Sequence, residues 1–247
     1  MLRVKIGVLL LLAALMATLV MLHTHGVTGP SFWGWTYRTL PAIPIYLGIA
    51  LSAIPFFIGL WLDHQRQSLR WAGIVLIMFS SFAMRIAAIA YRPDASGIDR
   101  PNLEMIRISD ENPDVMSYYV DAAALSKIPL RQWMPAYGEL MWQFHLHAKT
   151  KPPGPILYWL ALIKMLGING TTALLGGLGI AVLSVAAIPA TYFLINQLTR
   201  DSDAAMFGSA FLALCPGFVL FFPMFDQSYI LLSCALIAFW FAALRKD

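Results

Sequence analysis

The stretch TALLGGLGIAVLSVAAIPATYFLINQL, residues 172–198, contains no charged residue. It is longer than the roughly 20 apolar residues that an α-helix needs to cross a lipid bilayer. Comparable apolar runs lie at residues 5–22, 41–62, 71–91, 204–222 and 227–244. The sequence therefore predicts an all-α integral membrane protein with about six transmembrane helices.

The composition points to the same class of protein. Hydrophobic residues make up 59% of the 247 residues and charged residues only 12%, and the mean hydropathy is +0.69. Soluble domains carry about 25% charged residues, so this composition excludes a soluble globular enzyme, a disordered tail and a nucleic-acid binder. The net charge of +4 adds little, because basic residues in membrane proteins mainly mark the loops that stay in the cytoplasm.

A further apolar run, residues 153–166, is too short for a full crossing and predicts a re-entrant or interfacial helix. The positive-inside tendency tests this interpretation. If the run does not cross, the cytoplasmic ends of the spans carry Arg3, Lys5, Arg66, Arg70, Arg200, Arg245 and Lys246. If it does cross, the last three of these residues move outside. We therefore expect six spans in the plasma (inner) membrane, cytoplasmic termini, and the short helix on the outer side.

The polar residues concentrate in one predicted outer loop, residues 92–152. Loops of this length are usually functional or disordered, and the aromatic residues in this one predict amphipathic helices that fold against the membrane surface. We expect an N-terminal two-helix membrane segment, residues 1–70, and a membrane module, residues 71–247, that contains the loop. Eight of the 13 carboxylates lie in the loop: Asp94, Asp99, Glu104, Asp110, Glu111, Asp114, Asp121 and Glu139.

The first candidate site is the segment SDENPDVMSYY, residues 109–119. Pro113 followed by Asp114 predicts the start of a helix, because proline suits the first helical position and a carboxylate in the first turn is favoured by the helix dipole. Two interpretations stay open for Asp114. It either stabilises the helix end, or it accepts a proton from a nucleophile or holds a metal ion.

The second candidate site is HLHAKTKPPGP, residues 145–155, directly before the short helix. Lys149 and Lys151 at the membrane surface form either a cationic site for a phosphate or an anchor to anionic head groups. The prolines predict an extended approach and a fixed helix start, which would hold Lys151 in a defined place. His145 and His147 share a face only in a strand, so they are weak candidates for metal ligands.

Two further candidates are charged residues beside or inside predicted spans. Asp226, between two apolar runs, either caps the next helix or contributes to a site. With six spans it returns to the same side of the membrane as Asp114 and Lys151, whereas a seventh crossing would separate them. Arg85 lies inside the third span, about 9 Å by helical rise from its outer end. It either snorkels to the surface or binds a lipid phosphate.

These segments resemble the GT-C superfamily of membrane glycosyltransferases over roughly residues 71–244. Asp114, four residues before Tyr118 in the first large outer loop, resembles the Asp-Glu-x-x-Tyr region of that superfamily. The segment KPPGPILYW, residues 151–159, is similar to the Lys-Pro-Pro-x-x-Tyr-Trp stretch of its family 39-like branch, which contains the protein mannosyltransferases and aminoarabinose transferases. Asp226 after Phe225, followed by an apolar helix, resembles a later Asp motif of that branch.

The resemblance implies an inverting transfer of one sugar from a polyprenyl-phosphate-linked donor to an acceptor hydroxyl. Carried over by position, Asp114 is the general base on the acceptor. Lys151, together with Arg85, stabilises the departing polyprenyl phosphate, since an anionic leaving group needs cationic partners. Asp226 supports the acceptor or a divalent metal ion. The implied partners are the lipid-linked donor and membrane lipids; the sugar, the acceptor and the oligomeric state stay open.

The sequence departs from the family pattern in three respects. Val115 follows Asp114 where the family usually has Glu, which leaves Asp110 as a rival general base. Thr150 stands where an acid often precedes the lysine, which weakens the inference of a metal ion. The length of 247 residues is short for such enzymes, so we expect an N-terminal fragment or a minimal relative.

Two other classes of function are compatible with a multi-pass membrane protein. The first is a membrane transporter or permease subunit, and the second is a non-catalytic membrane scaffold. Transporters tend to have broken helices and polar residues near the bilayer midplane. In this sequence the spans are nearly free of charge and the polar residues concentrate in the outer loop, which favours the transferase.

The predicted topology is tested by a reporter of membrane sidedness fused after Arg200. The fusion is expected to report the cytoplasmic side, as is a second fusion after Arg66. A periplasmic signal after Arg200 would place Asp226 and Asp114 on opposite sides of the membrane and would refute a shared site.

Overall fold

The computed structural model describes residues 7–8, 10–11, 14–15, 42–90, 113–145, 148–220 and 224–244. Within these ranges the regular secondary structure is helical and contains no strand, as the sequence predicts. Three described stretches are long and apolar enough to cross a membrane: Gln67–Ala87, Gly170–Thr199 and Phe225–Leu244. They coincide with three of the predicted spans, those at 71–91, 172–198 and 227–244.

The other predicted spans have different outcomes. Helix α2, Ala42–Gln65, covers the run 41–62. The run 204–222 is divided into α11, Ser202–Ala213, and α12, Pro216–Leu220. Pro216, the first residue of α12, accounts for the division, because proline lacks the backbone N–H that would continue the hydrogen bonds of the preceding helix. The run 5–22 lies largely outside the described residues, so the count of six spans and their orientation stay predictions.

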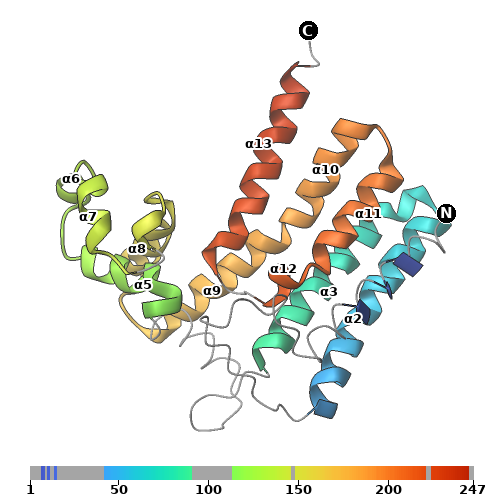
Figure 1. Ribbon diagram of the computed structural model, residues 1–247, viewed down its shortest axis with the longest axis horizontal. Coiled ribbons are helices and arrows are strands. Elements are labelled where there is room, and N and C mark those ends of the chain that lie inside the picture. The colour runs from blue at the N-terminus through green and yellow to red at the C-terminus, as the bar shows by residue number, and fades with distance from the viewer. Residues whose placement is uncertain are drawn as a thin grey trace.

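The three candidate membrane-spanning stretches belong to a helical bundle with its own hydrophobic core. The core is formed by side chains of α2, α3 (Arg70–Ala90), α10 (Ala187–Thr199), α11 and α12. Figure 1 shows α9 (Gly170–Val185) leading into α10, and α13 (Ser228–Leu244) beside α10. Helices α2 and α3 approach closely at Gly59 and Gly73, where a Cβ on either would lie 2.5 Å from the carbonyl oxygen of the other.

Buried Arg70 holds together one end of this bundle. Its side chain donates hydrogen bonds to Asp63 at the end of α2 and, at 3.0 Å, to Asp203 in α11. Figure 1 shows this end next to the start of α11. Arg66 and Arg200 lie in the turns of the same end, so basic residues predicted to be cytoplasmic are grouped there. The predicted domain boundary after residue 70 falls at the start of α3 and stays a prediction.

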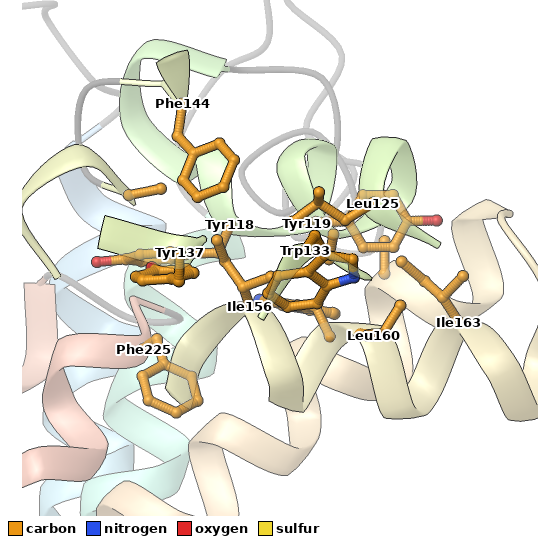
Figure 2. Close-up of a cluster of buried hydrophobic side chains, with 14 of the residues drawn as sticks. Tyr118, Tyr119, Leu125, Trp133, Tyr137, Phe144, Ile156, Leu160, Ile163 and Phe225 are labelled. Atoms are coloured by element: carbon orange, nitrogen blue, oxygen red, sulfur yellow. The ribbon is translucent and has the colours of Figure 1, made fainter. Parts of the chain in front are cut away.

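Helices α5 to α8 build a second hydrophobic core to one side of the bundle (Figures 1 and 2). Helix α8, Gly154–Leu166, begins directly after Pro153, as the prolines predict. Its interfacial position stays a prediction. Around it lie the helices and 3-10 turns of the predicted outer loop: α5 (Pro113–Leu125), α6 (Leu130–Trp133), α7 (Tyr137–Leu140), η4 (Met141–Gln143) and η5 (Ala148–Thr150).

This second core is attached to α9 through a close contact at glycine. The side-chain oxygen of Asn169 accepts a hydrogen bond from the backbone N–H of Thr172 at 2.9 Å and starts α9 after a tight turn. The Tyr158 hydroxyl donates to the carbonyl oxygen of Gly176 at 2.7 Å. The Trp159 ring packs so closely on Gly176 that a Cβ there would overlap the ring. Glycine at this position therefore lets α8 dock on α9.

Substitution of this glycine tests the contact between the two helices. We expect Gly176→Ala to lower the free energy of unfolding by about 1–3 kcal/mol, because the added methyl group must displace the buried Trp159 ring. Gly138→Ala is the matched control, since a Cβ at Gly138 meets no atom within 4 Å. Thermal unfolding in detergent micelles measures both variants, and equal midpoints for them would refute the packing argument.

Candidate functional site

Lys151 and Asp226 meet at the junction between the two cores, as the sequence predicted for one composite site. The Nζ of Lys151 lies 3.2 Å from Oδ1 of Asp226, and the two side chains are 32% and 34% exposed. Lys151 lies just before α8, and Asp226 lies in the 3-10 turn η6, Phe225–Gln227, directly before α13. The ion pair therefore connects the start of α8 to the start of α13, and solvent still reaches both charged groups.

Three tyrosines surround this ion pair. The Tyr118 hydroxyl lies 3.4 Å from Oδ1 of Asp226. The Tyr137 hydroxyl donates to the backbone carbonyl oxygen of Lys151 at 3.0 Å. The Tyr229 ring centroid lies 5.8 Å from Nζ of Lys151, within the range of a cation–π attraction. Lys151 is thus fixed through its backbone and through its charge.

The hydroxyl groups of Tyr118 and Tyr137 stay protonated well into the alkaline range. Burial and, as a smaller effect, the negative charge of Asp226 raise the pKa of Tyr118. Burial and the charge of Asp121 raise the pKa of Tyr137 to about 12. Both tyrosines are therefore neutral hydrogen-bond donors at physiological pH. The site combines one cation, one carboxylate and phenolic donors, a set that can bind an oxyanion beside a hydroxyl-bearing molecule.

Sequence reasoning did not identify the pairing of His145 with Asp121. Nδ1 of His145 lies 2.8 Å from Oδ1 of Asp121, and the backbone N–H of His145 donates to Oδ2 at 3.1 Å. Asp121 is buried on α5, three residues after Tyr118. A helix places residues three and four apart on one face, so the spacing of Asp114, Tyr118 and Asp121 contained the signal that would have found this carboxylate.

Of the two predicted metal ligands, only His145 lies within the described residues. Asp121 orients the His145 ring, while His147 lies outside the described residues. In the described part of the chain no group of three or more His, Cys, Asp or Glu side chains is arranged to hold a metal ion.

The remaining predicted residues of the outer loop have mixed outcomes. Asp114 lies in the first turn of α5, as predicted, but its side chain lies outside the described part of the structure. Asp110 lies outside the described residues altogether. Lys149 lies in η5 and is half-buried. No ion pair joins it to another described residue.

Arg85 does not join the Lys151 cluster. It lies inside the helical bundle and is 0% exposed, so the snorkelling interpretation is wrong. One nitrogen, Nη1, donates to the hydroxyl of Ser184 on α9. The guanidinium carbon lies 3.8 Å from the centroid of the Phe218 ring on α12. Arg85 therefore belongs to a separate polar position within the bundle.

No protein-family model, curated protein or solved structure matches this chain. The resemblance to GT-C glycosyltransferases stays a hypothesis that rests on the sequence segments. The candidate site is therefore defined by its geometry: Lys151, Asp226 and the tyrosines that contact them.

The ion pair predicts a measurable coupling between its two residues. Lys151→Met and Asp226→Asn are each expected to lower the free energy of unfolding, and the double variant is expected to lose less than the sum. Because the pair is partly exposed, the coupling should be about 0.5–1 kcal/mol. Lys149→Met combined with Asp226→Asn is the control and should be additive. Chemical unfolding in micelles gives both values, and additivity for the Lys151 pair would contradict the contact.

Proposed function

We propose that this protein is a polyprenyl-phosphate-sugar-dependent glycosyltransferase that acts at the outer face of the plasma (inner) membrane. The observation that carries the proposal is the ion pair between Lys151 and Asp226. Two of the three segments that resemble GT-C enzymes meet in this pair, and the third supplies Tyr118 beside it. Asp114 lies one helical turn before Tyr118 in α5. The three segments therefore converge at one place, as a composite active site requires.

The proposed reaction assigns a role to each of three residues of this chain, and a divalent metal ion beside Asp226 stays open. Asp114 accepts the proton of the acceptor hydroxyl while that oxygen attacks the anomeric carbon of the donor sugar. The bond between the anomeric carbon and the phosphate oxygen breaks, with inversion at that carbon, and the polyprenyl phosphate leaves with the bonding electron pair. Lys151 stabilises the phosphate charge that develops. Asp226 positions Lys151 before the donor binds and then faces the acceptor.

The position of the cluster suits a substrate of this kind. Asp226 lies at the start of an apolar stretch that is long enough to span a membrane, Phe225–Leu244, and Lys151 pairs with it there. Both side chains are about one third exposed. A lipid-linked donor can keep its polyprenyl chain in the bilayer while its phosphate reaches Lys151. The protonated hydroxyls of Tyr118 and Tyr137 add donors for the oxygens of the phosphate or the sugar.

A transporter or permease subunit is the second candidate function. It is favoured by the division between α11 and α12 and by the charged Arg85 buried beside α12, since transporters use broken helices and intramembrane charges. Solute flux into proteoliposomes without consumption of any lipid-linked sugar would support this function. The cluster at Lys151 lies outside the helical interior of the bundle, and this favours the transferase over the transporter and over a non-catalytic scaffold.

The general base is tested by Asp114→Asn in the full-length chain. Transfer is expected to fall by at least 100-fold, because the acceptor hydroxyl loses its proton acceptor, while the thermal unfolding midpoint stays within a few degrees. Mass spectrometry of a mixture of polyprenyl-phosphate sugars incubated with the purified protein measures consumption of the donor.

Two further variants make this test specific. Glu139→Gln removes an exposed carboxylate of α7 in the same outer region and should leave transfer unchanged. Asp110→Asn distinguishes the rival base. Full transfer by Asp114→Asn would refute the assignment of Asp114, and loss of transfer only in Asp110→Asn would move the role to that residue.

A further inference from the structure

Arg85 is a buried cation without a matching anion among the described residues. Its side chain is 0% exposed, and its described partners are the Ser184 hydroxyl and the face of the Phe218 ring. No ion pair joins it to a described carboxylate. Removing a charge from water is costly unless the charge is paired and hydrogen-bonded. Hydroxyl and ring contacts alone leave much of that cost uncompensated.

The unpartnered atoms of Arg85 form one edge of the guanidinium group. Both Nε and Nη2 are buried and lack hydrogen-bond partners among the described residues, whereas Nη1 donates to Ser184. The Nε and Nη2 hydrogens point in parallel and match the spacing of two oxygens of a carboxylate or a phosphate. This buried edge therefore has the donor spacing that a two-point contact with an oxyanion requires.

The surroundings hold this edge in place. The side-chain amide of Gln227 donates to the carbonyl oxygens of Gly217 and Phe218 at 3.2 and 3.0 Å, and this fixes the segment that carries the Phe218 ring. Ser184 in turn donates to the carbonyl oxygen of Ala181 at 2.9 Å. The Arg85 side chain extends from α3 and is held by its contacts with α9 and α12 before any ligand binds. Such preorganisation favours binding.

We propose that the Nε and Nη2 edge of Arg85 binds the oxyanion head group of an anionic amphiphile inside the helical bundle. The site is separate from the Lys151 cluster, and the proposal does not depend on sugar transfer. Arg85 lies in the half of α3 remote from Arg70, and Figure 1 shows α12 near that end of the helix. A lipid that enters between the helices can place its head group there while its chain stays in the bilayer.

The test titrates the full chain, purified in dodecyl maltoside, with dodecyl phosphate and, in a second arm, with dodecanoate. Dodecyl phosphate is expected to raise the unfolding midpoint saturably by several degrees, since a ligand that binds only the folded state stabilises it. The titrations use the Lys151→Gln background, because the proposed transferase site also offers a cation to a lipid phosphate. In this background the addition of Arg85→Gln should abolish the shift, and the addition of Arg66→Gln, which removes an exposed cation at the opposite end of the bundle, should retain it.

Each outcome has a defined meaning. A shift with dodecyl phosphate alone identifies a phosphate site, and equal shifts with both probes identify a general oxyanion site. No shift in the Lys151→Gln protein, or a shift that persists when Arg85→Gln is added to it, overturns the proposal. If Arg85→Gln does not fold, Arg85→Lys replaces it in the test. This variant keeps the charge but loses the two-donor edge, so it should bind dodecyl phosphate at least fivefold more weakly. An unchanged affinity would overturn the proposal.

Discussion

The contact between Lys151 and Asp226 lies at the junction between the core built by α5 to α8 and the helical bundle. An ion pair as exposed as this one contributes little stability by itself. The free energy at the junction comes instead from aromatic packing, because Phe225 lies within 5.4–6.3 Å, centroid to centroid, of Tyr118, Tyr158 and Tyr229. The aromatic rings hold the two parts together, and the ion pair determines where the charges lie. That division of roles leaves the charges of Lys151 and Asp226 accessible to solvent, as the proposed transfer mechanism requires.

The sequence predicted those features that follow from local composition. An apolar run of about 20 residues needs no tertiary information to be recognised as a span, and three such runs appear as long apolar helices. The predicted topology, which follows the distribution of basic residues, places Lys151 and Asp226 on one side of the membrane. The two residues form an ion pair, as that placement allows, and the topology itself stays a prediction. The division of the run at 204–222 had a local signal in Pro216 that the hydropathy of the run concealed.

Features that depend on packing between distant helices were not predictable in the same way. The pairing of Asp121 with His145 requires the fold of the loop between α5 and α8, and nothing near His145 in the sequence points to its partner. Arg85 is buried because α9 and α12 pack against its side of α3. Hydropathy alone places an arginine near a helix end at the surface, where it can snorkel, and the structure places it inside.

Helix α3 carries two buried arginines whose environments differ in kind. Arg70 is neutralised by Asp63 and, across the bundle, by Asp203, so its burial is explained within the chain. Arg85, on the same helix, has a hydroxyl and an aromatic ring and keeps one edge unpartnered. If Arg85 served only to join helices, as Arg70 does, carboxylates would be expected beside it, as Asp63 and Asp203 lie beside Arg70. The difference implies that the charge of Arg85 is matched by something outside the described residues, and an oxyanion is the chemical group that its open edge fits.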